Sequence, residues 1–328
     1  MAAKTQNILI FGATGLVGQH ITRAILNNKA SFDKIAIFTS SNTLWTKSEE
    51  VDRLKAEGVE IIAGNLASAD AVTEAFSSGP YDTVVSCVGR PIIHQQLRLI
   101  ELADAHPAIK RFFPSEYGTD IEFGPASAHE KPHQQKLKVR AALRDVKDLE
   151  YTYVVTGPYG DADTGLFLSA RPTADEETGT FDVKRKRAVL LGSGDGKVSL
   201  TTMRDVGKLV VAALLHPEEA RNRALRVNSF TTTPKELVAE FERQTGGEPW
   251  RVDYTSLDRL KELEQRAWEA GEPAAGGLTL RRIWSEGGTL YEKRDNALIG
   301  REDGLDSLQS TVKQAIEVQN RASGKAAL

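Results

Sequence analysis

A run of glycines near the start of the chain has the spacing of a dinucleotide-binding turn. The run Gly12-Ala13-Thr14-Gly15-Leu16-Val17-Gly18 follows an apolar stretch and opens a helix-periodic one. In such a turn the glycines permit a tight bend, the approach of backbone to a pyrophosphate, and close packing of helix on strand. The amino end of the helix offers unpaired N–H groups to the phosphates. A glycine-rich turn without a ligand is the alternative. The residues that we expect at the diphosphate are Gly12, Thr14, Gly15, Leu16, Val17 and Gly18.

The end of the second apolar stretch indicates which nicotinamide dinucleotide is bound. An NAD site places Asp or Glu about 20 residues beyond the glycines, where the carboxylate bonds the ribose 2′-hydroxyl. Here the stretch ends Thr39-Ser40-Ser41-Asn42, and the first carboxylate is Glu49. No arginine stands at this strand end, but hydroxyls can donate to a 2′-phosphate and a lysine can add positive charge. The pattern predicts NADP(H), held here by Thr39, Ser40, Ser41 and Lys47.

The chain lacks the Tyr-x-x-x-Lys pair with which ordinary short-chain dehydrogenases move a proton. None of its seven tyrosines is followed by lysine four residues later. A lysine near a helix start, partly desolvated under a nicotinamide cleft, has a lowered pKa and can exchange a proton. Lys136 lies near the start of a helix expected over 134–146. From the residues alone, a solvated helix lysine remains the alternative.

A segment of the first half resembles the NmrA-like family. The run Phe112-Phe113-Pro114-Ser115-Glu116-Tyr117-Gly118 is similar to the F-x-P-S-E-[FY]-G segment of that family, especially of its isoflavone reductase and phenylcoumaran benzylic ether reductase branch. The glycine run and segments 86–89, 136–140 and 151–155 follow in the family order. The resemblance is dense from residue 7 to about 160 and thinner beyond.

The resemblance implies an atypical short-chain reductase that uses NADPH. The lysine that opens the family's K-x-x-[IV]-R segment is its general acid/base, and it falls on Lys136. We expect a small conjugated substrate, aromatic or a secondary metabolite. Its identity does not carry over, because the segment after the sixth strand departs from the family pattern. Besides Lys136, the residues expected at the nicotinamide are Cys87, Val88, Gly89, Pro158 and Tyr159. Those expected at the substrate, with plain core as the alternative, are Tyr117, Tyr159, Phe167 and Trp284.

The family also offers two other functions. One is a non-catalytic NAD(P)-sensing regulator that binds a partner protein, and the other is a quinone reductase. Non-catalytic members lack the reductase lysine, whereas this chain keeps a lysine at position 136. We therefore expect an NADP-dependent oxidoreductase with a small-molecule substrate.

The elements that position these residues alternate between apolar runs and helix-periodic segments. Runs at 7–11, 35–39, 59–63, 83–86, 111–113 and 151–155 are expected strands. Strands that are apolar on both sides require a parallel sheet covered on two faces. We predict a Rossmann-type, doubly wound α/β domain over 1–157. A smaller, mixed α/β substrate domain is expected over 158–328, with segments that return to the first.

The second half of the chain has a different pattern of apolar and polar residues. An alternating, strand-like stretch is expected over 181–191, and helices over 206–215, 233–244, 256–270 and 307–318. Within that stretch the basic run 184–187 is expected on a solvated hairpin edge. The letters H-E-x-x-H occur at 129–133, but Pro132 disrupts the helical turn that a zinc site needs. We expect no metal.

Composition excludes several other classes of protein. The 328 residues include 42 Lys and Arg against 45 Asp and Glu, a net charge of −3, which gives no electrostatic case for binding nucleic acid or an anionic membrane. A single cysteine excludes an intramolecular disulfide and a multi-thiolate metal site. No apolar run approaches the ~20 residues of a membrane span, and no signal peptide is recognisable. We expect a cytoplasmic monomer or homodimer.

Overall fold

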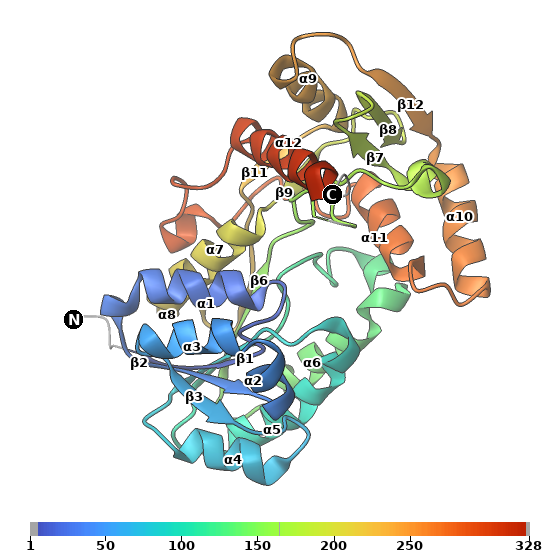
Figure 1. Ribbon diagram of the computed structural model, residues 1–328. Coiled ribbons are helices and arrows are strands. Elements are labelled where there is room, and N and C mark those ends of the chain that lie inside the picture. The colour runs from blue at the N-terminus through green and yellow to red at the C-terminus, as the bar shows by residue number, and fades with distance from the viewer. Residues whose placement is uncertain (1–5, 164, 326–328) are drawn as a thin grey trace.

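A seven-stranded parallel sheet forms the centre of the molecule (Figure 1). The computed structural model describes residues 6–163 and 165–325. The strand order is β10-β6-β5-β4-β1-β2-β3, so the order reverses between β1 and β4. The predicted doubly wound Rossmann-type sheet is confirmed. Its strands are β1 (Gln6–Phe11), β2 (Phe32–Thr39), β3 (Glu60–Ala63), β4 (Thr83–Ser86), β5 (Arg111–Phe113), β6 (Glu150–Val155) and β10 (Arg223–Arg226).

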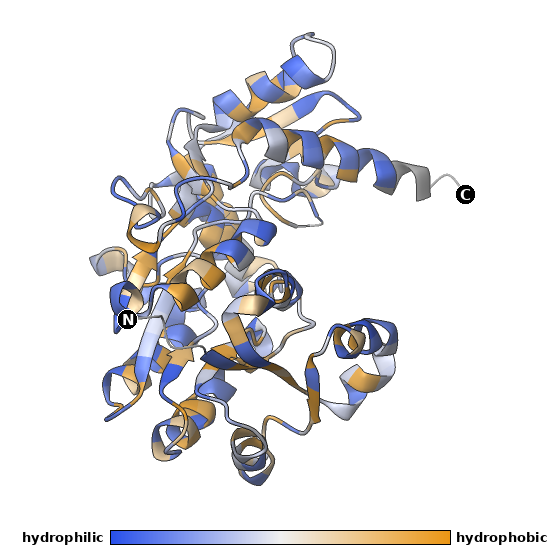
Figure 2. Ribbon diagram, turned by 90° about the vertical axis from the view of Figure 1, so that its left-hand side faces the viewer, coloured by the Kyte–Doolittle hydropathy of each residue, from blue (hydrophilic) through white to orange (hydrophobic). Residues whose placement is uncertain are grey.

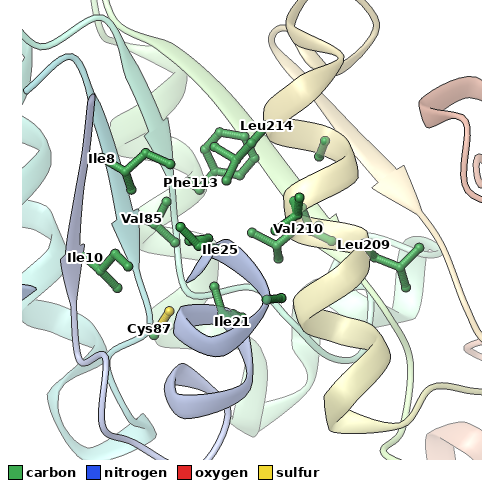
Figure 3. Packing of buried hydrophobic residues seen from close by; sticks show 14 of the residues in the cluster. Ile8, Ile10, Ile21, Ile25, Val85, Cys87, Phe113, Leu209, Val210 and Leu214 are labelled. Atoms are coloured by element: carbon green, nitrogen blue, oxygen red, sulfur yellow. The ribbon is translucent and has the colours of Figure 1, made fainter. Parts of the chain in front are cut away.

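Helices cover both faces of this sheet. Alternate residues of β1 point to opposite faces, and all four from Ile8 to Phe11 are buried. Figure 3 shows Ile8 and Ile10 on the same side as Ile21 of the first helix and Leu209 of the seventh. Burial on both faces explains why the strand sequences are apolar throughout. One face carries α1 (Gly18–Asn27) and α7 (Met203–Leu215), and the other carries α4 (Ala69–Ser77), α5 (Gln96–Ala105) and α6 (Gln134–Arg144).

Part of the second half of the chain belongs to this sheet. Helix α7 packs closely on α1, where a Cβ atom added to Gly207 would lie 2.4 Å from the carbonyl oxygen of His20. Strand β10 pairs with β6 and extends the sheet. Segments from beyond residue 157 thus join the large sheet and its covering helices; the division into two domains stays a prediction.

The remainder of the second half has two small sheets and its own core. Its apolar centre includes Leu168, Phe181, Leu190, Phe241 and Trp250. Figure 2 shows polar and apolar residues alternating along the helices, as expected where one face is buried and the other solvated. The strands are β7 (Thr180–Asp182), β8 (Arg187–Leu191) and β12 (Arg251–Thr255) in one sheet, and β9 (Val198–Leu200) and β11 (Phe230–Thr232) in the other. The remaining α-helices of the second half are α8 (Pro217–Ala220), α9 (Pro234–Gln244), α10 (Leu257–Glu269), α11 (Ala275–Ser285) and α12 (Leu308–Lys325). Those of the first half are α2 (Ser41–Thr46) and α3 (Ser48–Ala56).

The stretch expected to be strand-like over 181–191 is not continuous. A hairpin is present, as its expected edge implied, but the stretch forms two antiparallel strands, because the chain turns at residues 183–186, where Lys186 has a φ of 46°. The basic run is not simply solvated: Arg187 forms an ion pair of 2.8 Å with Asp253 on β12. After β2 the chain folds into the short helix α2, over a segment for which no element was predicted. Within the described residues, no helix combines the length and apolar character needed to cross a membrane.

Candidate functional site

A cavity of about 390 Å³ lies over the carboxyl ends of the central strands. Loops that follow β1, β4, β5 and β6 line it from the sheet side, and residues 165–167, Arg171 and α11 line it from the second half. Ligands of doubly wound sheets bind at this edge, beside the point where the strand order reverses. The cavity brings together many of the predicted residues, namely Gly15, Leu16, Val17, Cys87, Val88, Gly89, Tyr117, Lys136, Pro158, Tyr159, Phe167 and Trp284.

Some residues of the glycine turn pack against neighbouring backbone, and others face the cavity. Gly12 has a φ of 76°, and a Cβ atom there would lie 2.6 Å from the carbonyl oxygen of Cys87. A Cβ atom on Gly18 would overlap the carbonyl of Gly12. These two glycines therefore permit the turn and do not line the cavity. Leu16 and Val17 do line the cavity, and their amides donate no hydrogen bond within the described structure. Free amides at a helix start suit a diphosphate.

The residues predicted at the 2′-phosphate lie outside the cavity lining. Ser40 accepts a hydrogen bond from the amide of Thr43 at 3.2 Å and so caps α2, while Ser41 is exposed in the first turn of that helix. The amine of Lys47 donates to the carbonyl oxygen of Thr14. It thus places a positive charge directly beside the glycine turn. A role for Thr39, Ser40, Ser41 and Lys47 in cofactor binding stays a prediction.

Lys136 lies in the first turn of α6, and its amine is directed at the loop after β5. Its Nζ donates to the carbonyl oxygen of Glu116 at 2.5 Å. Burial lowers the pKa of Lys136 to about 8; the Glu116 carboxylate opposes this effect, whereas the charges of Arg90 and Arg140 add to it. An amine with this pKa can both donate and accept a proton near neutral pH.

Arg140, one helical turn beyond Lys136, fixes the loop that holds the lysine. It is 1% exposed and donates to both carboxylate oxygens of Glu116, at 3.0 and 3.1 Å. It also pairs with Asp120 at 3.2 Å and with Glu122 at 2.9 Å. Sequence reasoning missed this role, although the i, i+4 spacing of the two basic residues puts them on one helix face.

The predicted aromatic residues join the two halves of the molecule at the cavity. The hydroxyl of Tyr159 donates to the carbonyl oxygen of Tyr117. Trp284 on α11 donates from Nε1 to the hydroxyl of Thr119 at 2.8 Å, and its ring lies 6.0 Å from that of Phe167. These side chains are therefore cavity walls as well as core.

Cys87 is buried against the glycine turn. Burial raises the pKa of its thiol to about 12, so a thiolate does not form near neutral pH. Three arginines that sequence reasoning missed also line the cavity: Arg90, Arg171 and Arg281. No motif marks them in the sequence, since their approach to one cavity depends on the packing of the two halves.

The family is decided by a match over most of the chain. A family model for the NmrA-like family matches residues 4–274. The chain belongs to the NmrA-like family. This NmrA-like chain is 30% identical over 240 residues to a phenylcoumaran benzylic ether reductase of Pinus taeda, covering 72% of this chain and 74% of that protein. It is 26% identical over 283 residues to an isoflavone reductase of Medicago sativa, covering 81% and 84%.

Solved structures show the same fold. The leucoanthocyanidin reductase of Vitis vinifera, solved as a binary complex with NADPH, superimposes with a TM-score of 0.78 at 21% identity, over 95% of this NmrA-like chain and 99% of that one. At this identity the likeness establishes the fold. The resemblance drawn from the F-x-P-S-E-[FY]-G segment is confirmed by the family match.

Proposed function

We propose that this NmrA-like protein is an NADPH-dependent reductase of a small conjugated, aromatic substrate, with Lys136 as general acid/base. The observation that carries the proposal is the place of Lys136. Its partly buried amine lines the same cavity as the glycine turn, and its pKa lies near 8. The kinship with isoflavone and phenylcoumaran benzylic ether reductases supports an NADP-dependent oxidoreductase.

The residues at the sheet edge suit a phosphorylated dinucleotide. Amides of Leu16 and Val17 would hold the diphosphate, and Lys47 with the hydroxyls at 39–41 would hold the 2′-phosphate. The lining residues 87–89, with Pro158 and Tyr159, would flank the nicotinamide. NADPH bound there supplies a hydride.

The protein's own part is to orient the substrate and to move a proton. The carbonyl of Glu116 holds the Lys136 amine at a fixed position, from which Nζ would donate a proton to the substrate as hydride is added. Phe167, Tyr159 and Trp284 would hold the substrate's ring and exclude water.

An assay of NADPH oxidation against enones, quinones and benzylic ethers tests this function. We expect turnover with at least one conjugated aromatic compound, because one cavity contains both the proposed dinucleotide-binding turn and the titratable amine of Lys136. Tight NADP binding without turnover of any compound would instead indicate the non-catalytic sensor. Turnover of quinones alone would point to a quinone reductase.

Lys47→Met is expected to weaken NADP binding about tenfold, the loss of one charge-assisted hydrogen bond. NAD affinity should fall less, because NAD carries no 2′-phosphate for the lysine to contact and shares only the diphosphate beside the glycine turn. Fluorescence titration with both dinucleotides measures the two affinities, and Lys55→Met, which removes an exposed lysine of α3, is the control. A wild-type preference for NAD would contradict the assignment.

A further inference from the structure

The cavity carries an excess of positive charge. Four cationic side chains line it, those of Arg90, Lys136, Arg171 and Arg281, and Glu116 is the one carboxylate among the described lining residues. The carboxylate of Glu116 is already neutralised by the two hydrogen bonds from Arg140. The cavity wall therefore carries more positive than negative charge.

Arg281 is the most buried of these cations. It is 6% exposed, and its guanidinium donates to the carbonyl oxygen of Leu166 at 3.3 Å. No carboxylate of the described chain forms an ion pair with it. Burial, together with the charge of Arg171, lowers the pKa of Arg281 to about 9. A buried charge without a partner is costly, so this position favours a ligand that brings an anion.

Arg171 adds a second cation near the first. Asp175 attracts it, but among the described residues the two form no ion pair. Its Nε is buried and has no hydrogen-bond partner in the described structure. Its terminal nitrogen reaches the carbonyl oxygen of Gly165 at 3.4 Å, at the far limit of a hydrogen bond. The charges of Arg171 and Arg281 repel each other, so an anion bound near both would stabilise both.

The position of Arg281 points to the substrate and not to the cofactor's phosphates. Arg281, Phe167 and Trp284 line the main cavity and also a second, adjoining cavity of about 130 Å³ within the second half. The rest of that second cavity includes the apolar side chains of Phe181 and Leu190. The glycine turn lines only the main cavity. Arg281 thus lies beside Phe167 and Trp284, at the place where the main cavity adjoins the apolar second cavity.

We propose that the substrate carries a carboxylate, which Arg281 binds with Arg171 alongside, while its aromatic part packs against Phe167 and Trp284. The planar guanidinium of arginine matches a carboxylate through two parallel hydrogen bonds. This inference rests on the proposed reductase function, in which the same ring is presented to the nicotinamide. It narrows the substrate class to anionic aromatic compounds.

Calorimetric titration of the full-length protein saturated with NADP+ tests the inference. The probes are cinnamate and its neutral analogue cinnamamide, which differ mainly in charge. We expect cinnamate to bind at least about tenfold more tightly than cinnamamide to the wild type. Arg281→Met should abolish that preference, Arg281→Lys should keep part of it, and Arg171→Met should reduce it. Arg266→Met, an exposed position on α10, should leave it unchanged.

The outcomes separate this inference from the function on which it rests. Equal binding of the two probes to the wild type would overturn the carboxylate site, whatever the variants do. An equal loss of NADP+ and cinnamate affinity in Arg281→Met would assign the arginine to the cofactor and overturn it as well. NADP+ binding with reduction of neutral enones, but without a preference for cinnamate, would leave the reductase function standing. If NADP+ does not bind to the protein, both the proposed reductase function and the carboxylate site are contradicted.

Discussion

Lys136→Met is expected to lower kcat/KM for NADPH-dependent reduction by about 10²- to 10⁴-fold, the range that general acid–base groups contribute. The methionine keeps the length and apolar stem of the side chain but cannot donate a proton. Steady-state rates of NADPH oxidation measure the loss. NADP affinity, followed by fluorescence titration, should change less than about threefold (~0.65 kcal/mol), because the contacts proposed for the diphosphate are the backbone amides of Leu16 and Val17 and do not involve Lys136.

The matched control is Lys138→Met, two residues further along α6. Lys138 is exposed and does not line the cavity, so its loss should leave the rate within about twofold of the wild type, as is usual for a solvated surface residue. A near-wild-type rate for Lys136→Met would remove the lysine from the mechanism and leave the aromatic walls and the cofactor as the remaining machinery.

The pH dependence of the reduction rate is a second test of the role of Lys136. Because burial lowers the pKa of Lys136 to about 8, the amine is protonated below that pH and neutral above it. A general acid acts in its protonated form, so the rate of reduction should be level below pH 8 and fall above it. The reverse oxidation needs the neutral amine and should rise through the same pH. Both limbs should vanish in Lys136→Met.

The large sheet could be predicted because its signals are local. The residues from Ile8 to Phe11 are buried on both faces, and that burial is visible as an unbroken apolar run. The second half gives weaker signals, since its strands are short and pair across long separations. Strand β12 pairs in parallel with β8 about 60 residues earlier, and no local pattern specifies such a partner. The position of the turn between β7 and β8 was not predicted for a related reason, because the turn at residues 183–186 interrupts an otherwise regular alternation.

The candidate site was predictable where one helix or one turn carries the signal. Lys136 could be placed at a helix start, but its lowered pKa depends on the loop after β5, which closes over its amine. The network around Arg140 and the unpaired guanidinium of Arg281 both depend on packing between segments far apart in sequence. Arg281 looks like an ordinary helix arginine until α11 is docked beside residues 165–167.

Arg140→Met is expected to lower the free energy of unfolding by about 3–5 kcal/mol, the cost of removing one partner from a buried ion pair. Arg140 is the shared partner of Glu116 and Asp120, each 1% exposed. Asp120 has a second ion pair, with Arg226 at 2.9 Å, whereas among the described residues Glu116 forms an ion pair with Arg140 alone. Urea unfolding followed by tryptophan fluorescence measures the change. Arg144→Met is the control: its half-exposed guanidinium pairs with Glu122 at the surface, where such a pair contributes about 0–1 kcal/mol.

A double variant separates unpaired charge from lost packing as the cause. In Arg140→Met with Glu116→Gln, the carboxylate most dependent on Arg140 is replaced by a neutral amide of similar shape. If the buried charge of Glu116 causes the instability, the double variant should be more stable than Arg140→Met alone, by about 1–3 kcal/mol. If the two losses simply add, the arginine acts through its stem and its contact with the Tyr153 ring at 4.6 Å. In that case the loop that orients Lys136 is held by packing, and its charges are secondary.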